Sequence, residues 1–446
     1  MAAFSQTLNF ADLKRRPMAS RVSKVNISPQ NGAIFEPGGN IQISLPQMSS
    51  SYACLDQAYL RFKVKAVGEA AHLDHSAYSL ISRVDTTSSS AVIDSCSNYG
   101  VYMSYLLDSG MGAASAKDWG AICLGMGGDD ENTHLGAPLS KTVPKTMCLP
   151  FMTGLFNSSK QIPLDTGAPL TFTFHLQDAA NALIASVHAA QPTGYVITDV
   201  EFCTYVTTLS ADSQALLDQS VAGIGYNVIF EATSNTTAHK EAAQTQVISN
   251  LGFRYSALSR VSVIHRVNSN ANKFGQLSIS NRSSAKLSSA SLILGGLSVP
   301  QRPIRCGDGD FAEILSETLL SWGVLGSQDH QLGFCGVTRA ADGLEGTHVN
   351  RYALEDAKYA DDKDAAFAAT YAAENGTFGF SIDTDLIKSG ASSDGIYSGT
   401  STLATTTQSR LTYSGASTDD QTIDYFANYT CILSMDSVSR GFMVSV

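Results

Sequence analysis

The sequence has few charged residues. Asp, Glu, Lys and Arg make up 15% of its 446 residues, and hydrophobic residues make up 43%. Disordered chains combine low hydrophobicity with high charge, so this composition excludes a largely disordered protein. It predicts a surface that is covered by uncharged polar residues or buried against partners, as in β-rich proteins that assemble. The length suits two domains of ordinary size.

Long apolar runs are also missing. No run approaches the length of a membrane-spanning helix. The first residues, MAAFSQTLNFADLKRRP, lack the apolar core of a secretory signal. The eight cysteines include no CxxC pair, which argues against a zinc site. We therefore expect free thiols in a reducing compartment, without secretion.

Clusters with catalytic or metal-binding spacing are scarce. The candidates are HLDH at 72–75, the glycine-rich stretch 124–132, the Ser327, Asp329 and His330 group, and DDKD at 361–364. Each lacks the remaining ligands or the strand and helix context of its motif, and HLDH reads as a solvated loop. We expect no enzyme, no cofactor and no metal.

Short alternating runs dominate what is present. Residues 58–66 and 170–176 place apolar side chains on one face and polar ones on the other, which is typical of half-buried strands. Short helices are predicted at 97–110, at 211–221 with Ser210 as the N-cap, and at 310–323. Long polar stretches at about 110–145, 326–376 and 390–415 predict structured excursions or binding loops.

The elements follow the same order in both halves of the chain, with a boundary near 217–225. This order predicts two copies of one β-sandwich. We expect an arm at 1–26, an N-terminal domain at 27–222 and a C-terminal domain at 223–446. The first core-facing strand is expected at Ile41, Ile43 and Leu45, after the turns in ISPQNGAIFEPGGN.

The N-terminal arm is basic although the chain carries a net charge of −11. Its cations are Lys14, Arg15, Arg16, Arg21 and Lys24. Such an arm suits an anionic partner, but five cations can also simply solvate a loose terminus.

Several segments in order carry a family resemblance. They include NGAIFEPGGNIQISLP, DQAYLRFKVKA, GLFNSSKQIPLDTGAPLTFTFHLQ, LGGLSVPQRPI and FAEILSETLLSWGVLG. From about Pro29 to the C-terminus, the chain resembles the double jelly-roll major capsid proteins of polinton-like viruses and their relatives, the adintoviruses and virophages.

This resemblance implies an all-β fold of two tandem eight-stranded antiparallel jelly rolls with a few short helices and long loops. It implies homotrimeric, pseudo-hexameric capsomers in the icosahedral shell of a double-stranded DNA virion. The partners would be neighbouring capsomers, penton proteins and minor capsid or cement proteins. The arm would face inward, toward genome DNA or an internal membrane. The protein would be made in the host cytoplasm or nucleus, and the helices at 97–110 and 310–323 would be equivalent.

A two-domain β-sandwich lectin or adhesin is the alternative. It predicts aromatic platforms on exposed loops, and the loop aromatics here are Trp119, Tyr352, Tyr359 and Tyr371. It also predicts an export signal, which this sequence does not show.

Overall fold

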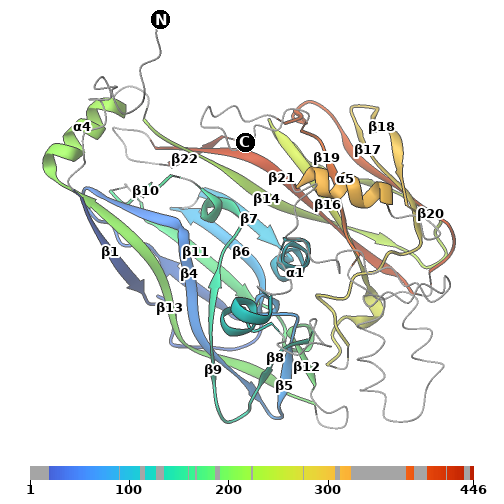
Figure 1. Cartoon of the computed structure of the whole chain (residues 1–446), viewed down its shortest axis with the longest axis horizontal. Helices are drawn as coiled ribbons and strands as arrows, with labels where there is room; N and C mark the ends of the chain where they lie inside the picture. The colour runs from blue at the N-terminus through green and yellow to red at the C-terminus, as the bar shows by residue number, and fades with distance from the viewer. Residues whose placement is uncertain are drawn as a thin grey trace, which may run out of the picture.

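The computed structural model describes residues 20–445, except 90, 111–115, 127–134, 159, 166–167, 186–190, 222–224, 275, 307–311, 323–377, 386–398, 418 and 436–441. Two antiparallel β-sandwiches stand side by side in these residues (Figure 1). We call them the N-terminal sandwich, residues 20–209, and the C-terminal sandwich, residues 226–445.

The N-terminal sandwich has two main sheets. The first has the order β1 (Ser20–Ile27), β13 (Gly194–Leu209), β4 (Ser51–Val67) and β10 (Ile162–Pro163), with β2 (Ile34–Phe35) beside β13 and β9 (Lys145–Pro150) beside β4. The second has the order β3 (Asn40–Ser44), β11 (Leu170–Leu176), β6 (Ile81–Ser88) and β7 (Ala91–Ser97). A small third sheet joins β12 (Leu183–Ala185), β5 (Ala71–Asp74) and β8 (Leu135–Leu139).

The C-terminal sandwich repeats the two main sheets. One has the order β14 (Tyr226–Lys240), β21 (Gln421–Met435), β16 (Leu258–Val267) and β19 (Phe380–Asp383), with β22 (Phe442–Ser445) beside β21. The other has the order β15 (Gln246–Asn250), β20 (Thr407–Tyr413), β17 (Leu287–Leu294) and β18 (Leu297–Arg305).

Both sandwiches have the same topology. When the eight principal strands of each are counted along the chain, one sheet holds the first, eighth, third and sixth strands, and the other holds the second, seventh, fourth and fifth. Strands β9 and β10 share the sixth position, since both pair with β4. The prediction of two tandem eight-stranded sandwiches is confirmed.

The helices lie between strands. Helix α1 (Tyr99–Gly110) and helix α5 (Ala312–Ser321) each follow the fifth strand and precede the sixth, which confirms that they are equivalent. Helix α4 (Ala211–Val221) connects the sandwiches, and the Ser213 backbone N–H donates to Ser210 Oγ at 3.3 Å, the predicted N-cap. Shorter helical segments are η3 (Ala77–Leu80), η4 (Ala116–Leu124), η5 (Gly154–Asn157), α3 (Ala179–Ala182) and η6 (Asn268–Asn270).

Aromatic side chains fill the core of the N-terminal sandwich. Phe172 of β11 is fully buried and stacks on Phe202 of β13 with ring centroids 5.4 Å apart, while Phe156 lies 4.9 Å from Phe172. These rings join the two main sheets. The alternation predicted for β4 and β11 is confirmed, because the apolar residues of both strands are buried: Leu60, Phe62, Val64, Leu170, Phe172, Phe174 and Leu176.

Two sequence-based boundaries are wrong. Ile41 does not begin the first strand, because β1 precedes it at Ser20–Ile27 and overlaps the expected arm at 1–26. The stretch 390–415 contains the principal strand β20, so the boundary of that loop is wrong. The stretch 110–145 contains η4 and β8, which agrees with the prediction of a structured excursion. The expected loop at 326–376 lies outside the described residues.

Candidate functional site

The two sandwiches meet along a buried contact, which we call the junction. Helix α1 lies at its centre (Figure 1), and ten of its twelve residues are buried. In β21, Ile423, Tyr425 and Ala427 pack into the C-terminal core, so the alternate residues face outward, where Phe426 joins the N-terminal core cluster. Helix α1 therefore covers the outer face of a C-terminal sheet.

Tyrosines of α1 make the apolar part of the junction. Tyr102 stacks on Phe426 with ring centroids 4.6 Å apart, and its hydroxyl donates to Asn428 Oδ1 at 2.9 Å. The Tyr105 hydroxyl lies 2.9 Å from Ser381 Oγ of β19. Both tyrosine rings are buried, which adds apolar contact area to the junction. Both hydroxyls have hydrogen-bond partners on the opposite sandwich, which fixes the orientation of the two tyrosines.

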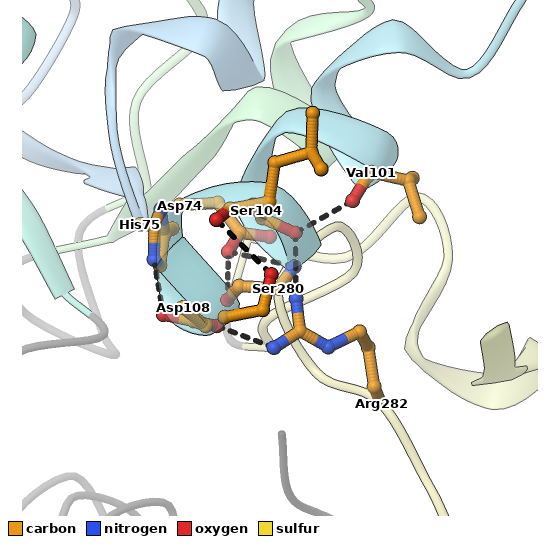
Figure 2. A network of polar contacts seen from close by, with 9 residues as sticks. Asp74, His75, Val101, Ser104, Asp108, Ser280 and Arg282 are labelled. Atoms are coloured by element: carbon orange, nitrogen blue, oxygen red, sulfur yellow. Dashed lines mark hydrogen bonds and ion pairs between the residues drawn. The ribbon is translucent and has the colours of Figure 1, made fainter. Parts of the chain in front are cut away.

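Asp74 joins the sandwiches through the backbone (Figure 2). Its carboxylate accepts the backbone N–H groups of Ser278, Ile279 and Ser280 at 2.8, 2.7 and 3.2 Å, and also the Ser280 hydroxyl. Asp74 is 1% exposed. Burial raises the pKa of its carboxyl, and the bonds from Ser280 and the backbone oppose that rise.

A buried ion pair continues this network. Asp108 of α1 pairs with Arg282, and its other carboxylate oxygen lies 2.9 Å from His75 Nε2. Arg282 also donates to Ser104 Oγ at 3.0 Å. The Arg282 and Asp108 side chains are 0% and 5% exposed. A buried charge without its partner is strongly destabilising, so the network favours one arrangement of the two sandwiches.

The interpretation of HLDH as a solvated loop is wrong. His72 and Asp74 lie on β5, and Asp74 and His75 are buried at the junction. The partners of Asp74 on the C-terminal sandwich are about 200 residues away in the sequence, so no local pattern could have shown this role. Among the described residues, no group of three or more His, Cys, Asp or Glu side chains is placed to hold a metal.

A second set of contacts joins β7 and the residue after it to the C-terminal sheet that holds β14, β21 and β16. Asn98 donates to Asp424 Oδ1 at 2.8 Å, and Arg266 Nε lies 2.6 Å from Asp424 Oδ2. Asp94 of β7 is 8% exposed, and burial raises the pKa of its carboxyl to about 7, against the effect of backbone bonds from Ser95 and Thr233. Strand β7 of one sandwich therefore packs against strand β14 of the other through side-chain contacts.

A cavity of about 250 Å³ lies beside these contacts. Arg260 stacks over the Trp322 ring at 3.8 Å and pairs with Glu231 at its wall. The residues that line the cavity come from both sandwiches, so it belongs to the junction.

The predicted inner-face residues fall into two groups. Lys14, Arg15 and Arg16 lie outside the described residues. Arg21 and Lys24 are exposed on the edge strand β1, and Lys24 Nζ donates to the Tyr59 hydroxyl at 2.6 Å. The seven cysteines in the described part are free thiols. None of the described helices is both long and apolar enough to cross a membrane.

Comparison with known proteins gives structural matches only. No family model and no curated protein matches this chain. Solved structures match along nearly the whole length. The PBCV-1 virus capsid matches with a TM-score of 0.58 and 11% identity, covering 96% of this chain and 97% of that one.

Two further matches are major capsid proteins. The Faustovirus protein has a TM-score of 0.56 and 9% identity, covering 95% of this chain and 92% of its own. The mavirus protein has a TM-score of 0.53 and 10% identity, covering 100% and 95%. The chain has the double jelly-roll fold. Its two sandwiches are the two jelly rolls, and the junction is the contact between them.

Proposed function

We propose that this double jelly-roll protein is a viral major capsid protein. Three copies would form a pseudo-hexameric capsomer of six jelly rolls, and capsomers would tile an icosahedral shell around a DNA genome. One observation carries the proposal: two sandwiches of identical topology are fixed side by side by a buried junction. This arrangement supplies two near-equivalent building blocks for each chain. The similarity to three viral capsid structures over nearly the full length supports it.

The low charge of the chain agrees with this role, because the cores of protein interfaces are depleted of charged residues. A lectin would instead present aromatic platforms on loops. Trp119 is 39% exposed, and the other three loop aromatics lie outside the described residues. The matched structures reported above are capsids and capsid proteins, which favours the capsid over the lectin. A structural role also requires no catalysis.

Light scattering after size exclusion, followed by negative-stain microscopy, tests the proposal. A capsid protein gives a particle of about three times the 47.2 kDa chain mass, with a hexagonal outline. A monomer that binds a glycan array would overturn it.

We further propose that Lys14, Arg15 and Arg16 face the shell interior and contact genome DNA, an internal membrane or a minor capsid protein. Penton and cement proteins are expected as additional partners in the virion. Because β1 begins at Ser20, removing residues 1–19 should leave trimers intact and impair shell assembly. Loss of the trimers in that variant would contradict an assembly role confined to the arm. Removing residues 1–27 is the control that should destabilise the sandwich itself.

A further inference from the structure

The cavity at the junction has walls from both jelly rolls. Helix α1 and the segment that follows β9 form one wall, which includes Tyr102, Leu106 and Met152. Strands β14, β16 and β21 form the other wall, where Trp322 lies against Arg260. The cavity volume is about 250 Å³. An apolar cavity of about 150 Å³ can hold benzene, so this cavity has room for one aromatic ring with a short substituent.

Several polar groups of these walls bond to one another. The Tyr102 hydroxyl donates to Asn428 Oδ1 at 2.9 Å. Asn428 Nδ2 in turn donates to Glu231 Oε1 at 2.9 Å and to Thr233 Oγ1 at 3.1 Å. These groups have their hydrogen bonds without a ligand, and they hold the wall in one shape. The apolar side chains and aromatic rings beside them favour a flat apolar body in the cavity.

Arg260 is the lining residue with donors to spare. A guanidinium carries five N–H donors in a planar fork. Arg260 Nη2 donates to Glu231, whereas Nε has no hydrogen-bond partner in the described part of the chain. The guanidinium lies 3.8 Å from the centre of the Trp322 ring, which fixes its plane. The side chain is 15% exposed and lines the cavity, so a ligand there can accept a hydrogen bond from it.

The charges at the cavity favour a neutral ligand. Arg260 pairs with Glu231, so the two opposite charges balance within the walls. A carboxylate ligand would lie close to the Glu231 carboxylate, and like charges at short range repel each other. A cationic ligand would meet Arg260 in the same way. A neutral carbonyl oxygen accepts a hydrogen bond from Arg260 without either repulsion.

We propose that the cavity at the junction binds a small neutral aromatic carbonyl compound, an aryl ketone or amide of one ring. The ring packs on Leu106, Met152 and Trp322, and the carbonyl oxygen accepts a hydrogen bond from Arg260. All the lining residues belong to one chain, so the site does not depend on assembly. The ligand contacts both jelly rolls, and its binding therefore stabilises the folded chain with the junction closed.

Two probes of the same shape test the site. Acetophenone has the carbonyl oxygen, and α-methylstyrene has a CH₂ group in its place. Ligand-observed NMR titrations of the full chain give a dissociation constant for each probe. We expect saturable binding of acetophenone with a dissociation constant below about 1 mM, the weak range that suits a fragment of this size.

Arg260→Lys tests the hydrogen bond. Lysine keeps a positive charge opposite Glu231 but has a single nitrogen and no planar fork. The ratio of the two dissociation constants removes the difference in hydrophobicity between the probes. The preference for acetophenone in this ratio should fall at least about fivefold in Arg260→Lys, since a hydrogen bond from a charged donor is lost. Arg266→Lys is the matched control, because Arg266 pairs with Asp424 at the same junction but does not line the cavity, and its ratio should not change.

Met152→Trp tests the location. Met152 lines the cavity and is 37% exposed, so a larger side chain there narrows the opening. Both probes should bind at least about tenfold more weakly, because the added ring takes up space in an occupied site. Ile248→Trp is the control: Ile248 is 57% exposed on β15 and does not line the cavity, so both affinities should stay as in the wild type. Circular dichroism checks the fold, and Leu106→Phe replaces Met152→Trp if that variant fails to fold.

Three results would overturn the proposal. The first is no saturable binding of either probe up to about 5 mM, beyond the affinity expected of such a fragment. The second is an affinity that Met152→Trp leaves unchanged, because the probes would then bind elsewhere. The third is a ratio that Arg260→Lys leaves unchanged, because the carbonyl group would then not be recognised by Arg260.

Discussion

The buried pair of Asp108 and Arg282 gives the sharpest prediction about stability. In Asp108→Asn, the Arg282 guanidinium stays fully buried while the opposing carboxylate is lost. Removing one partner of a buried ion pair costs about 3–5 kcal/mol. A typical domain is stable by about 5–15 kcal/mol, so this loss would be a large fraction of the total. With an m-value of about 3 kcal/mol/M, the urea midpoint should fall by about 1–2 M.

Trp322 provides the assay, because its ring lies 6.1 Å from that of Tyr105 across the junction. The chain has only two tryptophans, so Trp119→Phe leaves Trp322 as the single fluorescent reporter. Its emission should change at lower urea in Asp108→Asn than in the parent.

The double variant Asp108→Leu with Arg282→Met is the control, since it removes both charges at similar volume. Replacing a whole buried pair is often nearly neutral, so it should lie within about 2 kcal/mol of the parent. Two results would show that the pair does not hold the junction: a loss of unfolding free energy below about 1 kcal/mol in Asp108→Asn, or a double variant that is as unstable as the single variant.

Three further changes have defined outcomes. Phe172→Ala removes a fully buried ring from the stack on Phe202 and should cost about 3–5 kcal/mol in thermal unfolding, whereas a cost below about 1 kcal/mol would contradict the tight packing. Burial raises the pKa of Asp94 to about 7, above its usual value of 3.8, so folding favours the protonated carboxyl. From pH 4 to pH 7 the wild type should therefore lose stability relative to Asp94→Asn. A difference between their urea midpoints that stays constant over this pH range would refute the prediction. Ser210→Ala removes the cap of α4 and should cost about 1 kcal/mol of stability, unlike Ser210→Asp, which preserves an acceptor for the Ser213 N–H.

The elements that sequence predicted best are those with apolar residues at every inward position. β11 buries two leucines and two phenylalanines in strict alternation, so its pattern is unambiguous. The hydrophobic pattern did not predict β20, because two of its four buried positions are the polar residues Thr407 and Ser409. The sequence did not predict β1 either, because the sequence of an edge strand with no fully buried residue resembles that of a polar arm. Hydrophobic periodicity reports burial in an apolar core, and these strands supply little of it.

The junction was harder to predict than the sheets. The spacing of Val101, Tyr102, Tyr105 and Leu106 indicated the helix α1, but not that it packs against a second sandwich. The role of Asp74 depends on backbone groups at 278–280, which only the fold brings near it. The shared topology was easier to predict, because the order of strands and helices along the chain can be read from the sequence, and it is the same in both halves.

The pairing of first and last strands has a consequence for synthesis of the protein on the ribosome. Ser20 pairs with Leu209, and Tyr226 pairs with Met435, so neither jelly roll completes its first sheet until its last strand has been made. Pairing across such long separations is slow, since a large loop must close before the contact forms. Moreover, the side chains of α1 cannot contact their partners on β21 until about 320 further residues have been made. The junction face of this helix therefore has no partner during most of the synthesis of the chain, and such exposed apolar surface favours aggregation.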